Sequence, residues 1–178
     1  MRLQEHWDRI HYPKIVMNFS PRLQRDIKEH PIKNLPEYGS YYIWGPAGSG
    51  KTTMAAQMYI EARKKFYFDK LPGGCDFITV YDLLSNVRSA IDDPTRDPDS
   101  ALQAFAIRQY LVLDDLGATR TTDWELSQIQ ILINIRYEQL LTTVITSNHS
   151  LEELGEVLGD ERIPSRIERM TKKVIGLK

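Results

Sequence analysis

The amino-acid sequence predicts an α/β fold with three layers, in which a parallel β-sheet lies between two layers of helices. Short β-prone apolar runs alternate along the chain with longer segments whose apolar residues have helical spacing. One short run, residues 110–113, is continuously apolar, as is typical of a strand buried on both faces of a parallel sheet. Strands and helices that alternate in this way join through right-handed crossovers.

The expected elements can be placed from these patterns and from the turn residues between them. Strands are expected at residues 41–44, 76–80, 110–113, 142–146 and 173–177, and helices at 52–65, 82–90, 101–108, 123–140, 151–158 and 164–170. Asp123 is placed to cap the helix that starts there. Residues 1–38 are punctuated by Pro13, Pro21, Pro31 and Pro36 and are expected to form an N-terminal arm on a core of residues 39–178.

Composition limits the class of protein. The chain has 178 residues, of which 42% are apolar and 26% charged, which predicts one globular domain with its own core. A net charge of -1 argues against coating nucleic acid by bulk electrostatics, although it leaves room for a local basic patch. With a single cysteine, no apolar run of membrane-spanning length and no signal-peptide core, we expect a cytoplasmic protein without a membrane partner.

A glycine-rich loop follows the first expected strand directly. Gly45-Pro-Ala-Gly-Ser-Gly-Lys51-Thr52 has the pattern GxxxxGK[ST], in which backbone N–H groups and a helix N-terminus converge on phosphate oxygens. Lys51 is expected to reach the β- and γ-phosphates of ATP, and Thr52 to offer its hydroxyl to Mg²⁺. The candidate nucleotide-binding residues are Gly45, Pro46, Ala47, Gly48, Ser49, Gly50, Lys51, Thr52 and Thr53. The alternative is a glycine turn that only joins the strand to the helix, and it would not explain the presence of Lys51 and Thr52.

Two aspartates follow the apolar run about sixty residues later. A buried parallel strand brings Asp114 and Asp115 to the sheet edge beside the phosphate loop. Asp114 is expected to hold Mg²⁺, directly or through water, and Asp115 to orient and polarise the attacking water. Capping of a helix by either aspartate is the alternative.

Polar residues near the last strands are further candidates. Asn148 ends the run 142–146 and could position the water or contact the γ-phosphate, with a strand-end turn as the alternative role. Arg162, Arg166 and Arg169 lie near a short helix, and one could enter a neighbour's site as an arginine finger. Tyr12 and Pro13 are candidate neighbours of the adenine ring, which core packing would explain equally well.

The motifs together resemble those of an AAA+ core in order and spacing. The phosphate loop is followed by Leu-Asp-Asp-Leu-Gly at 113–117, Ile-Thr-Ser-Asn at 145–148 and Arg-Ile-Pro-Ser-Arg-Ile at 162–167. Together with Asp123-Trp124, Asn134 to Tyr137 and Leu151 to Leu154, they resemble the helicase loaders of the DnaC/DnaI type and the related IstB transposition helper.

The resemblance implies a set of roles. Lys51 and Thr52 match Walker A, Asp114 and Asp115 Walker B, Asn148 sensor 1 and Arg166 the arginine finger. It also implies a homo-oligomer with ATP at the subunit interface, binding of single-stranded DNA, and delivery of a replicative helicase during DNA replication.

The sequence departs from that pattern in three ways. Fewer than fifty residues precede the phosphate loop, whereas such loaders carry an N-terminal helicase-binding domain. About twelve residues follow Arg166, which leaves no room for a helical lid. Asp115 stands where AAA+ proteins most often have Glu, and the shorter carboxylate predicts slow hydrolysis.

Three other functions fit parts of the pattern. An IstB-like transposition helper would share the core and prefer duplex DNA. A small-molecule kinase on the same loop would need an acceptor pocket and would stay monomeric with ATP. A module that binds ATP without hydrolysing it is disfavoured by the presence of Lys51, Asp114 and Asp115.

Overall fold

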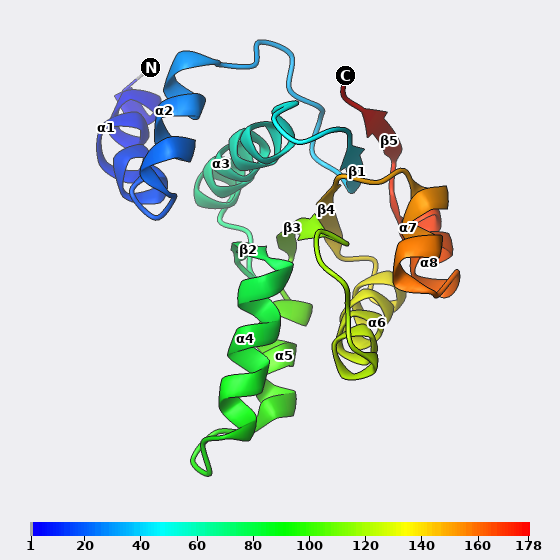
Figure 1. Ribbon diagram of the computed structural model, residues 1–178. Coiled ribbons are helices and arrows are strands. Elements are labelled where there is room, and N and C mark those ends of the chain that lie inside the picture. Colours follow the sequence, from blue (N-terminus) through cyan, green and yellow to red (C-terminus); the bar gives the residue numbers. More distant parts are fainter. Residues whose placement is uncertain (1) are drawn as a thin grey trace.

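The computed structural model describes residues 2–178, without the side chains of residues 2–4 and 6. Its centre is a sheet of five parallel strands in the order β2-β3-β4-β1-β5 (Figure 1). The strands are β1 (Tyr41–Trp44), β2 (Cys75–Thr79), β3 (Tyr110–Leu116), β4 (Thr142–Ser147) and β5 (Lys173–Gly176). The α/β fold with a parallel sheet is thus confirmed, and β3 runs three residues further than the apolar pattern predicts.

Helices cover both faces of this sheet. They are α1 (Arg2–Val16), α2 (Pro21–Glu29), α3 (Lys51–Asp69), α4 (Val80–Ile91), α5 (Pro98–Ala106), α6 (Asp123–Glu138), α7 (Leu151–Leu158) and α8 (Arg162–Met170). Alternate residues of β3 point to opposite faces: Leu111 and Leu113 pack with α4 to α8, whereas Tyr110 and Val112 pack with α3. Among the described residues, no helix is long and apolar enough to cross a membrane.

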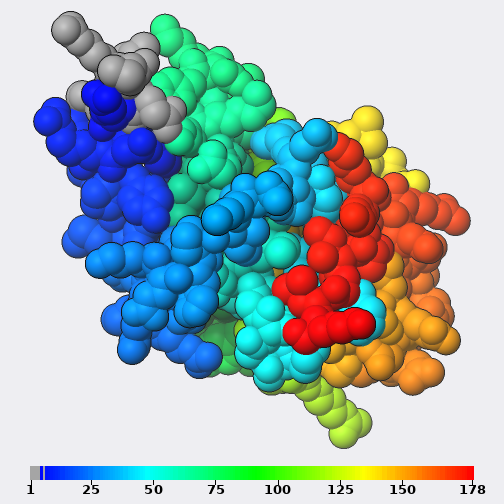
Figure 2. Space-filling view, turned by 90° about the horizontal axis from the view of Figure 1, so that it is seen from above, coloured from blue at the N-terminus to red at the C-terminus, as the bar shows by residue number. Residues whose placement is uncertain are grey.

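The N-terminal segment, residues 2–32, packs on the outer side of α3 (Figure 2). Trp7, Ile15 and Phe19 are buried there against Ala56 and Ile60 of α3. Pro21 begins α2, where a proline is favourable, but Pro13 lies inside α1 and does not interrupt it. The division into an arm at 1–38 and a core at 39–178 stays a prediction.

The start of α6 differs from the expected cap. Thr122, and not Asp123, is the N-cap residue, because its hydroxyl accepts from the Glu125 N–H while the Glu125 carboxylate accepts from the Thr122 N–H. This reciprocal capping box satisfies two N–H groups, whereas Asp123 as the cap would have lacked a partner glutamate at the third helical position. Asp123 is therefore the first helical residue, where its charge favours the helix N-terminus.

Candidate functional site

A large cavity of about 1220 Å³ opens at the carboxyl ends of β1, β2, β3 and β4. Of the predicted nucleotide-binding residues, the seven from Ala47 to Thr53 line it, whereas Gly45 and Pro46 do not. Asp114, Asp115 and Asn148 line the same cavity. The structure thus brings together the side chains that the sequence places at three different points of the chain.

The backbone of the phosphate loop depends on its glycines. Gly48 and Gly50 have φ values of 85° and 88°, in the left-handed region that favours glycine. At Gly45 an added Cβ would lie 2.4 Å from the backbone oxygen of Leu177. The chain after β5 therefore packs directly against the start of the loop, where Leu177 N also donates to the Trp44 carbonyl (Figure 2).

Lys51, the first residue of α3, is 5% exposed and lies within the loop. Its ammonium donates to the carbonyl oxygens of Gly45 and Pro46 at 2.9 and 2.8 Å. Burial lowers the pKa of Lys51, and the nearby charges of Asp115 and Asp114 act in the opposite direction. The loop therefore holds a cation beside two carboxylates at the edge of the cavity.

Asp114 is buried near the end of β3, with 3% of its surface exposed. Its Oδ1 accepts from the hydroxyls of Thr146, at 2.6 Å, and Thr52, at 3.1 Å. Burial raises the pKa of this carboxyl to about 6, an effect that the hydrogen bond from Thr146 reduces. A buried carboxyl thus shares its oxygen with the Walker A threonine.

The oxygen donors at this place fit Mg²⁺. Mg²⁺ is usually held by one or two protein oxygen ligands together with substrate phosphates and water. Asp114 and Thr52 supply such a pair, and no cluster of three or more His, Cys, Asp or Glu side chains able to hold a metal occurs in residues 2–178 as described. These two side chains fit a Mg²⁺ ion whose remaining ligands come from a nucleotide and water.

Asp115 reaches the cavity through an irregularity of the sheet. Leu113 pairs with Ile145 and Leu116 with Ser147, so the two aspartates lie opposite the single residue Thr146 in a β-bulge. Asp115 is exposed, and its φ of 62° is unusual for a residue with a side chain. Neighbours in a regular strand point to opposite faces, whereas here both carboxylates line one cavity.

The three arginines predicted as candidate finger residues lie on α8, and none of them lines this cavity. Arg162 is exposed and pairs with Asp160 at 2.6 Å. Arg166 is partly buried and forms no hydrogen bond or ion pair with any described residue. The structure of one chain does not bring either arginine to its own phosphate loop.

The sequence does not predict two features of the site. In the sequence Thr146 stands only as part of the motif at 145–148, although its hydroxyl contacts both aspartates. On the side formed by the N-terminal segment, the apolar lining residues are Ile15, Phe19, Leu23 and Ile32. Tyr12 and Pro13 are absent from this lining, and Tyr12 instead packs edge-on against Trp7.

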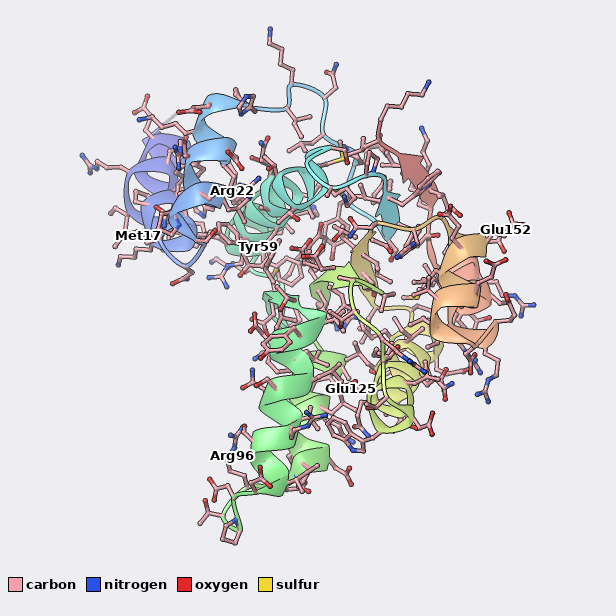
Figure 3. The ribbon with its side chains drawn as sticks, in the orientation of Figure 1. Met17, Arg22, Tyr59, Arg96, Glu125 and Glu152 are labelled. Carbon is pink, nitrogen blue, oxygen red and sulfur yellow. The ribbon has the colours of Figure 1, made fainter. Side chains whose placement is uncertain are left out.

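Arg22 of α2 and Tyr59 of α3, both labelled in Figure 3, belong to the same side of the cavity. Phe19 lies edge-on to both Tyr59 and Phe77, with ring centroids 6.0 and 5.1 Å apart. This side therefore combines apolar and aromatic residues with polar ones such as Arg22 and Asp26. Apolar walls with a few polar groups are common in sites for nucleotide-sized ligands.

Comparison with known proteins agrees with this geometry. The family model described as IstB-like ATP binding protein matches residues 37–174. The chain belongs to the IstB-like ATP-binding family. This IstB-like chain is 24% identical to the uncharacterised protein YqaM of Bacillus subtilis (strain 168) over 191 aligned positions. That alignment covers 97% of the chain but only 56% of YqaM.

Solved structures extend the comparison. A crystal structure of the DnaC helicase loader is 27% identical, with a TM-score of 0.66 over 92% of this chain and 96% of that one. The AMPPCP-bound DnaA of Aquifex aeolicus, 18% identical, has a TM-score of 0.62 over 92% of this chain and 49% of that one, which shows the fold alone. The IstB-like protein is thus an ATP-binding protein with an AAA+ fold.

Proposed function

We propose that this IstB-like protein hydrolyses ATP with Mg²⁺ and, as an ATP-bound homo-oligomer, loads or remodels a replicative helicase on single-stranded DNA. One observation carries the hydrolysis: Asp114, Asp115 and Asn148 line the same cavity as the phosphate loop. Asp115 is the discriminating residue, because a module that only binds ATP could use Asp114 as a Mg²⁺ ligand but has no need of a second carboxylate to polarise water.

Each cavity residue has a distinct task in this proposal. Lys51 and the loop N–H groups bind the phosphates, and Asp114 with Thr52 would hold Mg²⁺, which neutralises charge on the transferring phosphoryl group. Asp115 accepts a hydrogen bond from the attacking water, and Asn148 orients that water. Asp115 is one methylene shorter than Glu, so turnover is expected to be slow.

Arg166 is the preferred finger residue. It has no partner among the described residues, whereas Arg162 is already paired with Asp160. A guanidinium that cannot reach its own phosphate loop can complete the site of a neighbouring subunit, which makes hydrolysis depend on assembly. ATP then lies at the interface between two copies of the chain.

Mixing two inactive variants tests this arrangement. Arg166→Ala should retain ATP binding by the monomer and lose hydrolysis, while Lys51→Ala should weaken ATP binding itself. A mixture of the two restores some turnover, because Lys51→Ala subunits donate Arg166 to the intact loops of their neighbours. Arg169→Ala, a change on the same helix, is the matched control and should keep wild-type turnover. Absence of restoration with both proteins folded and assembled would remove Arg166 from the site.

The DNA and helicase parts rest on similarity. The DnaC structure is that of a helicase loader, and another solved structure with this fold is a replication initiator, DnaA, bound to AMPPCP and single-stranded DNA. The matched family model favours a second candidate, a transposition helper of the IstB kind that acts on duplex DNA. Binding of labelled single-stranded and duplex oligonucleotides, with ATP and at one salt concentration, separates the two.

A further inference from the structure

Thr146 of β4 contacts both aspartates through one oxygen atom. Its hydroxyl donates to Asp114 Oδ1 at 2.6 Å, and the same oxygen accepts from the backbone N–H of Asp115 at 2.9 Å. Thr146 is fully buried, so water does not replace these contacts readily. A single side chain therefore links the positions of two neighbouring residues on the adjacent strand.

The β-bulge explains why such a link is needed. At the bulge, two residues of β3 face one residue of β4, so a regular ladder hydrogen bond is missing there. The Asp115 N–H, which loses its ladder partner, is satisfied by the Thr146 side chain. The left-handed backbone at Asp115 costs free energy, and this hydrogen bond contributes to holding it.

The bond to Asp114 also selects which carboxylate oxygen faces the cavity. Oδ1 accepts from both Thr146 and Thr52, whereas Oδ2 accepts from no described residue. Because Thr146 binds Oδ1 from the side of the sheet, Oδ2 faces the cavity that Asp114 lines. Oδ2 is the atom available to Mg²⁺ or to a water bound to it.

We infer that Thr146 is a positioning residue that sets the Asp114 carboxylate for Mg²⁺ and the Asp115 backbone for the attacking water. This inference rests on the proposed ATP hydrolysis. Thr146 does not line the cavity, and it acts through the two aspartates. Loss of its hydroxyl should therefore change the Mg²⁺ dependence of ATP binding while leaving Mg²⁺-free ATP binding as it is.

A pair of variants isolates the hydroxyl. Thr146→Ser keeps it and Thr146→Ala removes it, while both lack the methyl group. The affinity for a fluorescent ATP analogue is measured over a series of Mg²⁺ concentrations and in EDTA, with phosphate release on the same samples. Thr146→Ala should need roughly 10- to 100-fold more Mg²⁺ for its half-maximal effect, as expected for the loss of hydrogen bonds to a charged group. Thr146→Ser should stay within about threefold of wild type.

Thr143, a second buried threonine of β4, supplies the matched control. It bonds to Arg136 and the Leu141 carbonyl, away from the cavity. Thr143→Ala should lower the free energy of unfolding and keep wild-type Mg²⁺ dependence. Thr146→Val, which keeps the side-chain volume, should match Thr146→Ala and covers the case in which the smaller variant is poorly folded.

The outcomes separate the two levels of the proposal. Wild-type dependence on Mg²⁺ in Thr146→Ala or Thr146→Val would overturn the role of Thr146 and leave ATP hydrolysis standing. An equal loss in Thr146→Ser and Thr146→Ala would overturn it as well, because the hydroxyl would then be irrelevant. If wild-type protein binds ATP without any effect of Mg²⁺, the proposed metal-assisted hydrolysis and the role of Thr146 fail together.

Discussion

Replacing Asp114 with asparagine is expected to stabilise the protein in the absence of nucleotide and metal. Burial raises the pKa of Asp114 from 3.8 to about 6, so the folded state binds this proton more tightly than the unfolded state. The ionised carboxylate therefore opposes folding above pH 6, and that cost disappears as the pH falls from about 6 to about 4. A shift of about two pKa units corresponds to about 3 kcal/mol at neutral pH, as an upper estimate.

Asparagine has no charge, and its oxygen can still accept from Thr52 and Thr146. Asp114→Asn should therefore raise the free energy of unfolding by about 1–3 kcal/mol at a pH of about 7.5, and by about half as much at pH 5. Urea denaturation in EDTA at both pH values measures this difference in the free energy of unfolding between the variant and wild type. Asp115→Asn, an exposed position, is the control and should change the free energy by less than about 0.5 kcal/mol.

The electrostatic reasoning would be refuted if Asp114→Asn and wild type had the same free energy of unfolding at pH 7.5. It would also be refuted if the difference between them had the same size at both pH values. A stabilised but inactive variant would show that the buried charge is retained for function at the expense of stability. Mg²⁺ with ATP should stabilise wild type more than Asp114→Asn, because only the carboxylate offers the metal a full charge.

Three further changes test other parts of the structure. Lys51→Ala should weaken ATP binding at least about tenfold by calorimetry, through loss of a charged phosphate contact; unchanged affinity would contradict the role of the loop. Arg136→Met should lower the free energy of unfolding by about 3–5 kcal/mol in urea denaturation, because the buried guanidinium donates to four backbone carbonyls and to Thr143. Arg88→Met, at an exposed position, should lower it by less than about 1 kcal/mol. Gln57→Leu removes the two hydrogen bonds that fix His30 and Ile32 to α3, so limited proteolysis within residues 2–32 should accelerate. The affinity for ATP should fall, while the affinity for inorganic tripolyphosphate stays unchanged. A rate of proteolysis equal to that of wild type would contradict this role of Gln57.

Much of the fold could be predicted because its signals are local. Five short apolar runs predict the five strands, and the phosphate motif predicts the loop between β1 and α3. The cap of α6 could also be predicted from the sequence, because Thr122-Asp-Trp-Glu125 has the spacing of a capping box. Taken alone, Asp123 is an equally good cap residue.

The arrangement around the aspartates could not be predicted in this way. Strand periodicity places Asp114 and Asp115 on opposite faces, and only the pairing of β3 with β4 creates the bulge that brings both to the cavity. The contact of Thr146 depends on the same pairing. Likewise, the docking of α1 on α3 decides that Phe19, and not Tyr12, lines the cavity. These are tertiary effects between residues far apart in the sequence.

In the proposed function, ATP bound at this cavity drives assembly and is hydrolysed there. Light scattering and phosphate release, recorded on the same purified sample with and without ATP, Mg²⁺ and single-stranded DNA, test it most directly. We expect a larger particle with ATP and Mg²⁺, slow phosphate release, and faster release when DNA is added. A protein that stays monomeric, with turnover indifferent to DNA, would contradict the account and favour a small-molecule kinase or a module that only binds ATP.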